Sequence, residues 1–126
     1  MGYLAKLTLC CLGVLWMTSC RSQDEETIIR IDKGTVEADV IGKDVQLVDV
    51  RTPQEYRNGH IDDAVNFNVN DASFLEQINT LDKEQPVYLY CKMGGRSNRA
   101  AEILKSEGFI KIYDYTGGYS DWQSDK

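Results

Sequence analysis

The residues best suited to covalent chemistry are Cys91 and Arg96, which enclose four residues that include Gly94 and Gly95. An apolar, strand-like run at 86–90 leads into the cysteine, and a helical pattern follows the arginine. A thiol at the tip of a strand, above a glycine turn that opens a helix, is placed differently from an inert core cysteine. This spacing therefore makes Cys91 a candidate nucleophile.

The loop after Cys91 is predicted to form a nest of backbone N–H groups that binds anions. Its two glycines can take a positive φ and turn their amides inward. The following helix, expected to begin near Ser97, adds free N–H groups and the positive end of its dipole. Lys92 and Arg96 add positive charge, so the field should lower the pKa of the thiol and favour the reactive thiolate.

The elements that position this loop alternate along the chain. Apolar and β-branched runs predict strands at 27–31 (an edge strand), 45–50, 64–69, 86–90 and 110–115. Helical patterns occupy 35–42, 52–59, 73–81 and 97–108, with a closing helical turn at 117–123. This alternation predicts an α/β fold with a small parallel sheet flanked by helices on both faces.

Two helix starts carry capping signals. Thr52 and Glu55 form a capping box around Pro53, and Ser73 and Glu76 repeat the pattern. Ligands of parallel α/β sheets bind at the carboxyl ends of the strands. Arg51 and Cys91 both follow predicted strands, so we expect them at the same edge of the sheet.

The N-terminal segment predicts a secretory signal. Lys6 precedes an apolar run at 7–17 that is too short to cross a bilayer, and the ending "MTSC" resembles a bacterial lipoprotein lipobox. The resemblance implies a signal peptide at 1–19, a lipidated Cys20 and a location in the bacterial cell envelope. An acidic tether then spans 20–26, and one domain spans 27–126.

Removal of this signal leaves Cys91 as the one free thiol, since Cys10 and Cys11 lie in the apolar run and Cys20 carries lipid. The chain has 14 Lys and Arg against 20 Asp and Glu, a net charge of −6. Such acidity argues against a nucleic-acid partner, and it leaves the lipid as the expected contact with the membrane.

Three segments in order resemble the single-domain rhodaneses, a family of sulfurtransferases: "VDVRTPQEYRNGHIDDAVNFNV", "VYLYCKMGGRSNRAAEILKSEGF" and "GGYSDW". The resemblance implies that Cys91 takes sulfane sulfur from thiosulfate or a similar anionic donor as a persulfide. A thiol or cyanide would then accept the sulfur. It implies no cofactor beyond this covalent intermediate, and we expect a monomer.

The resemblance also assigns roles to individual residues. The backbone amides of the loop would hold the donor, and Arg96 would bind its anionic end; the loop residues are Lys92, Met93, Gly94, Gly95 and Arg96. Arg51 and Glu55 would form an ion pair that braces the first segment. Asp49 is expected to end a strand rather than act as a base, and His60 to be structural. One histidine and one free cysteine cannot assemble a metal site.

Two other functions stay open. A catalytically silent domain of the same fold could serve as a binding module on the cell envelope, although the cysteine and its full loop are present. A cysteine phosphatase would also use a thiolate, an anion nest and an arginine. Phosphatase loops of this architecture hold five residues between cysteine and arginine, however, and this loop holds four.

Overall fold

The computed structural model describes residues 25–124. Within them, five parallel strands form one sheet in the order β1-β5-β4-β2-β3. The strands are β1 (Ile28–Ile31), β2 (Gln46–Asp49), β3 (Val65–Asn66), β4 (Val87–Tyr90) and β5 (Ile112–Tyr115). The predicted parallel α/β fold is confirmed, and β1 lies at an edge as expected.

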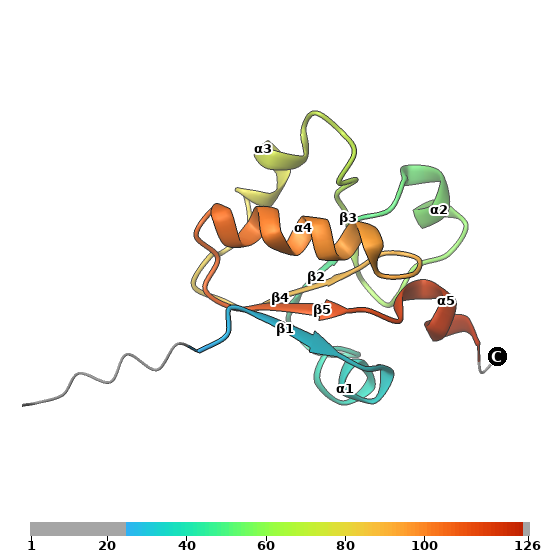
Figure 1. Cartoon of the computed structure of the whole chain (residues 1–126). Helices are drawn as coiled ribbons and strands as arrows, with labels where there is room; N and C mark the ends of the chain where they lie inside the picture. Colours follow the sequence, from blue (N-terminus) through green and yellow to red (C-terminus); the bar gives the residue numbers. More distant parts are fainter. Residues whose placement is uncertain (1–24, 125–126) are drawn as a thin grey trace, which may run out of the picture.

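Helices cover both faces of the sheet (Figure 1). They are α1 (Lys33–Asp39), α2 (Pro53–Arg57), α3 (Phe74–Ile78), α4 (Gly95–Ser106) and α5 (Gly118–Gln123). Helix α4 lies along one face and α1 along the other, while α2 and α5 stand at the end to which the strand arrows point. That end gathers the carboxyl ends of the strands, where α/β sheets bind ligands.

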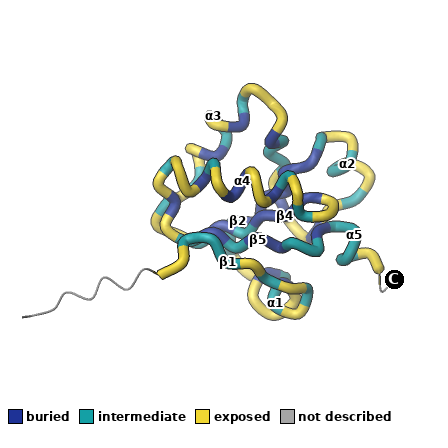
Figure 2. Tube along the Cα trace, viewed as in Figure 1, coloured by how far each residue is buried: buried dark blue, intermediate teal, exposed yellow. Residues whose placement is uncertain are grey.

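The core has two halves, one on each face of the sheet. Apolar residues of β4 point alternately to the two sides because side chains alternate along a strand. Val87, Leu89 and Cys91 pack with α3 and α4, whereas Tyr90 packs with residues of α1 and α5. The buried strands and the inner side of α4 form the dark band in Figure 2. Cys91 therefore lies on the face that α4 covers.

Two helix starts follow from their caps. The carboxylate of Asp32 accepts a hydrogen bond from the Thr35 backbone N–H at 2.9 Å, so α1 begins at residue 33, earlier than predicted. The predicted capping box of α2 is present, with Pro53 in its first turn.

Two local predictions are wrong. The strand expected at 64–69 is only Val65–Asn66. Ser73 does not cap α3, because its hydroxyl lies 2.6 Å from the Asp71 carboxylate and makes no capping bond. After the short strand, the Asn68 side chain accepts a hydrogen bond from the Asn70 backbone N–H at 3.1 Å, and before α3 the Asp71 carboxylate accepts one from Ser73. Local side-chain bonds thus compete with regular structure in both places.

The signal peptide at 1–19 and the lipidated Cys20 lie outside the described residues. Among residues 25–124, no helix is both long enough and apolar enough to cross a bilayer.

Candidate active site

The loop that follows β4 turns directly into α4. Gly94 precedes the helix with a φ of +100°, a left-handed conformation that favours glycine. A Cβ atom at Gly94 would also come within 2.7 Å of the Thr116 carbonyl oxygen. Gly95 was expected to take a positive φ as well, but this is wrong because it is the first residue of the helix. The helix thus begins before Ser97, the predicted start.

The Cys91 sulfur is buried against hydrogen-bond donors. The side chain is 1% exposed, and the Gly94 backbone N–H lies 3.0 Å from Sγ. The Ser97 hydroxyl oxygen is 3.6 Å from Sγ. Burial raises the pKa of Cys91, but hydrogen bonds from the Ser97 backbone and hydroxyl and from the Gly94 and Met93 backbone outweigh it and lower the pKa below its ordinary value. The site favours the thiolate.

Helix α5 fixes the orientation of this loop. Its backbone N–H groups at Tyr119 and Ser120 donate to the carbonyls of Cys91 and Lys92, at 2.8 and 3.1 Å. With these carbonyls turned toward α5, the following N–H groups are free to face the sulfur. The closing segment "GGYSDW" is therefore part of the site, although it lies far from Cys91 in the sequence.

Gly118 makes this docking possible, and we expect Gly118→Ala to disrupt it. A Cβ atom there would lie 2.5 Å from the Lys92 carbonyl oxygen and 2.6 Å from that of Cys91. The backbone must shift, so the substitution should cost about 3 kcal/mol or more of unfolding free energy and slow alkylation of Cys91. Urea unfolding and the alkylation rate at pH 7 measure the two effects.

Gly42→Ala is the matched control. Gly42 has a φ of +70° against +67° for Gly118, yet a Cβ atom there meets nothing within 4 Å. Gly42→Ala should lower the free energy of unfolding only by the cost of placing alanine in the left-handed conformation, about 1–2 kcal/mol. It should leave the alkylation rate of Cys91 unchanged. If the two variants lost the same free energy of unfolding, the close contact between Gly118 of α5 and the loop carbonyls would not contribute to stability.

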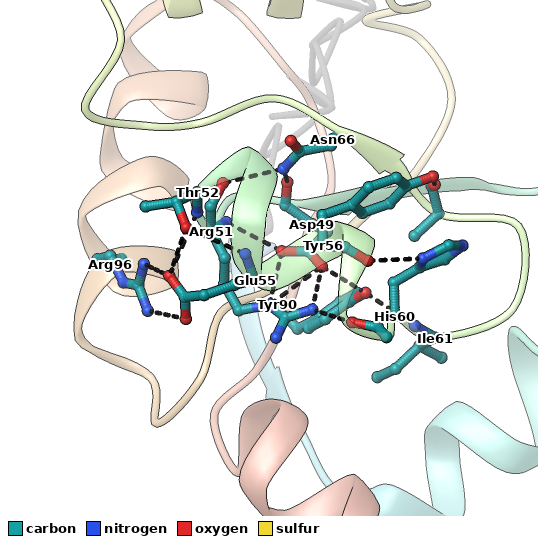
Figure 3. Close-up of polar contacts among 12 residues, drawn as sticks. Asp49, Arg51, Thr52, Glu55, Tyr56, His60, Ile61, Asn66, Tyr90 and Arg96 are labelled. Carbon is teal, nitrogen blue, oxygen red and sulfur yellow. Dashed lines mark hydrogen bonds and ion pairs between the residues drawn. The ribbon is translucent and has the colours of Figure 1, made fainter.

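Glu55 links the first predicted motif to the loop (Figure 3). Its two carboxylate oxygens lie 2.7 and 3.0 Å from the guanidinium nitrogens of Arg96. The same carboxylate accepts a hydrogen bond from the Thr52 hydroxyl at 3.0 Å. The Arg96 guanidinium and the Thr52 bonds lower the pKa of Glu55 to about 2. Glu55 thus caps α2 and holds the arginine that ends the active-site loop.

This pair predicts a pH-dependent contribution to stability. Because the pKa of Glu55 falls from 4.5 to about 2 on folding, the contribution is full above pH 4.5 and declines as the pH falls toward 2. Both side chains are partly exposed, so we expect Glu55→Gln to cost about 1 kcal/mol at pH 7. Urea unfolding at pH 7 and pH 2.5 should show this difference shrinking in acid. A cost that is the same at both pH values would contradict the assignment.

Arg51 pairs with Asp49, and the predicted ion pair between Arg51 and Glu55 is wrong (Figure 3). The Asp49 carboxylate lies 2.6 Å from an Arg51 guanidinium nitrogen, and both side chains are almost fully buried. Tyr90 donates its hydroxyl to the same carboxylate at 2.8 Å. The Arg51 guanidinium also donates to the Gly59 carbonyl at 2.8 Å. Asp49 ends β2 as expected and anchors a buried network beneath the site.

The remaining predicted residues lie around the loop. Lys92 is exposed, and Met93 is 76% exposed. A depression of about 240 Å³ beside the loop is lined by residues of α2, the loop and α5: Arg51, Glu55, Asn58, Lys92, Tyr119, Ser120 and Gln123. His60 stacks on Tyr56 with 3.9 Å between ring centroids, a packing role. The structure therefore brings the two predicted strand ends together at one opening.

Sequence reasoning missed Ser97, Tyr119 and the true partners of Arg96 and Arg51. The signal for Ser97 was its place in the first turn of α4, where hydroxyl groups commonly bond to the preceding loop. Within residues 25–124, no cluster of three or more His, Cys, Asp or Glu side chains is arranged to hold a metal ion.

A family model described as a rhodanese-like domain matches residues 32–125 of the chain. A Shewanella oneidensis protein named thiosulfate sulfurtransferase GlpE is 39% identical over 80 residues, which cover 64% of this chain and 77% of that protein. An uncharacterised Bacillus subtilis protein, YqhL, is 40% identical over 77 residues, 61% of this chain. The matched region spans 60% of the length of YqhL.

Solved structures give the same fold. A rhodanese-like domain protein from Staphylococcus aureus superposes with a TM-score of 0.66 at 29% identity, covering 74% of this chain and 89% of that one. A rhodanese-related protein from Thermoplasma volcanium superposes with a TM-score of 0.67 at 26% identity, covering 76% and 91%.

Proposed function

The chain belongs to the rhodanese-like domain family, and on that basis we propose that it is a sulfurtransferase that carries sulfane sulfur on Cys91. One observation supports this most strongly: the Cys91 sulfur is held among backbone N–H groups that lower its pKa, at the mouth of a four-residue loop. Relatives that share 30–39% of their aligned residues with the chain are named thiosulfate sulfurtransferases.

The proposed reaction has two steps. The Cys91 thiolate attacks the sulfane sulfur of thiosulfate, the S–S bond of the donor breaks, and sulfite leaves with the bonding electron pair. Cyanide or a thiolate then attacks the outer sulfur of the Cys91 persulfide, and the Cys91 thiolate is regenerated. No separate cofactor is needed, since the persulfide itself carries the sulfur.

The loop supports both steps through charge. The N–H groups that stabilise the thiolate are suited to a persulfide anion, because the negative charge moves only one atom outward. Lys92, exposed at the edge of the opening, can attract an anionic donor toward an otherwise acidic protein. The Arg96 guanidinium already donates two hydrogen bonds to Glu55. Arg96 would therefore bind the anionic sulfur donor through one of its remaining N–H groups.

We also propose that the protein acts from the bacterial cell envelope, held by lipid on Cys20, as a monomer. The charge order and the "MTSC" ending of the N-terminal segment support this location. Labelling with a radioactive fatty acid, compared with Cys20→Ser, tests the anchor; label that remains in the variant would refute it.

Intact mass spectrometry tests the sulfurtransferase proposal. The reduced full chain is incubated with thiosulfate, and we expect a gain of one sulfur atom that peptide mapping places on Cys91. Added cyanide should remove the sulfur and release thiocyanate. A protein that gains no sulfur from thiosulfate or polysulfide contradicts the proposal and favours the binding-module function. Hydrolysis of p-nitrophenyl phosphate without sulfur transfer would favour the phosphatase.

A further inference from the structure

The Arg51 guanidinium has one nitrogen that the buried network leaves unused. Nε and Nη2 donate to the Asp49 carboxylate, and Nη2 also donates to the Gly59 carbonyl at 2.8 Å (Figure 3). Nη1 donates to no group within residues 25–124, and it is not among the unpartnered polar atoms that are sealed from solvent there. Arg51 is 3% exposed, so this small exposed part includes the N–H donors of Nη1.

Arg51 lines the depression of about 240 Å³ between α2, the active-site loop and α5, which places the free Nη1 donors at its inner end. Polar side chains surround that position. Their amide and hydroxyl groups make no hydrogen bond in the part of the chain that the structure describes, and they belong to Asn58, Ser120 and Gln123. A buried guanidinium with free donors, surrounded by polar groups that have no other partner among these residues, is suited to hold an anion.

The charges at the depression also favour an anion. Glu55 is the one carboxylate among the described residues that line it, and both of its oxygens are bonded to Arg96. The charge of Arg51 is balanced by Asp49. Lys92 forms no ion pair within residues 25–124, so its charge is not compensated there. One uncompensated positive charge matches a carboxylate better than a phosphate group, which carries more negative charge.

Tyr119 joins the depression to the nucleophile. Its ring centroid lies 4.2 Å from Arg51 Cζ, so the ring covers one side of the guanidinium and holds it in place. Its backbone N–H donates to the Cys91 carbonyl at 2.8 Å. Cys91 itself does not line the depression. A molecule that reacts with the sulfur and also fills the depression must therefore extend from one to the other.

We propose that this depression binds the carboxylate of the sulfur acceptor, and that the acceptor is a small thiol whose carboxylate is a few bonds away from its sulfur. Thiosulfate is too compact to reach the depression from Cys91, because its sulfane sulfur is bonded directly to its anionic group. The acceptor thiolate attacks the outer sulfur of the Cys91 persulfide. The S–S bond of that persulfide breaks, the Cys91 thiolate leaves with the electron pair, and the product is the persulfide of the acceptor. The inference rests on the proposed function of Cys91 as sulfur carrier.

A single turnover of the full chain, loaded first with the persulfide on Cys91, tests this preference. The acceptors are β-mercaptopropionate and its amide, β-mercaptopropionamide, which have the same length. Each rate at low acceptor concentration is divided by the ionised fraction of that thiol. A hydrogen bond from a guanidinium to a carboxylate corresponds to about a tenfold effect, so the carboxylate should react about tenfold faster. Equal rates would overturn the proposal.

A charge placed in the depression tests its location. Gln123→Glu keeps the side-chain shape and should slow the carboxylate acceptor about three- to fivefold relative to the amide acceptor, because like charges repel at this distance. Gln85→Glu is the matched control, since Gln85 is exposed just before β4, at the opposite end of the sheet. The control should leave the ratio of the two rates unchanged. The same ratio in Gln123→Glu as in the control would show that the carboxylate binds elsewhere.

A binding measurement that needs no sulfur transfer separates the subsite from the proposed function. The S-methyl derivative of β-mercaptopropionate keeps the carboxylate but has no thiol. Its titration into the unmodified chain should shift the NMR signals of the Arg51 Nε–H group and of the Tyr119 and Ser120 backbone amides to saturation, whereas the corresponding amide should not. No saturable shift would overturn the proposal. A chain that binds the carboxylate but forms no persulfide would support the subsite and contradict the proposed function.

Discussion

Replacing Cys91 with serine is expected to abolish persulfide formation and to reduce thiocyanate production from thiosulfate and cyanide by about a thousandfold or more. The serine hydroxyl is nearly isosteric with the thiol but is not ionised at neutral pH, so it cannot attack the sulfane sulfur. The loop should keep its shape, since the bonds from α5 reach the backbone carbonyls of Cys91 and Lys92, not the sulfur. Intact mass and the rate of thiocyanate release measure the loss.

Leu75→Met is the control for the loss at Cys91. Leu75 lies in α3, outside the loop and the depression beside it, and is 46% exposed, so the substitution should leave sulfur transfer within about twofold. Sulfur that is still gained by the Cys91→Ser chain would place the carrier elsewhere. In that case the buried thiol of Cys91 would have a structural role.

Asp49→Asn is expected to lower the free energy of unfolding by about 3–5 kcal/mol, because it leaves the Arg51 guanidinium buried without a counter-charge. Arg51 is 3% exposed and Asp49 is 0% exposed, so water cannot replace the lost partner. The Asp49 carboxylate accepts hydrogen bonds from Arg51 and Tyr90. The asparagine amide would place its own N–H donor against one of these donors, so that hydrogen bond would be lost. Urea unfolding at pH 7 measures the loss.

Two further variants show whether the buried charge is the cause. Asp63→Asn changes an exposed carboxylate, and we expect it to alter stability by less than about 0.5 kcal/mol. The double variant Asp49→Leu with Arg51→Met removes both charges and should recover part of the loss. If the double variant is as unstable as Asp49→Asn, the cost comes from packing around β2 and not from the unpaired arginine.

The order of the elements could be predicted from the sequence because its signals are local. The apolar run that ends at Cys91, the capping box of Thr52 and Glu55, and the glycines after the cysteine each act within a few residues. Local patterns of this kind decide where strands and helices form, and alternation then requires a parallel sheet. They also place Arg51 and Cys91 at one edge, since the carboxyl ends of parallel strands meet there.

The partners of the charged side chains were decided only by the tertiary structure. The family resemblance implied that Arg51 pairs with Glu55, yet Arg51 pairs with Asp49, and Glu55 pairs with Arg96 from another element. Side-chain direction depends on how α2 lies against the loop, and four charged groups can pair in several ways that no periodicity distinguishes. The burial of both Asp49 and Arg51 selects the pair that leaves neither charge alone.

The sequence by itself determined the fold class, the strand-end position of Cys91 and the glycine turn beneath it, because these depend on backbone preferences of adjacent residues. Only the tertiary structure revealed that α5 bonds to the loop carbonyls, and that the Ser97 hydroxyl oxygen lies 3.6 Å from the Cys91 sulfur. Those contacts join residues from separate elements. They arise from the register of β5 beside β4 and the packing of α4 across both, which only the folded chain establishes.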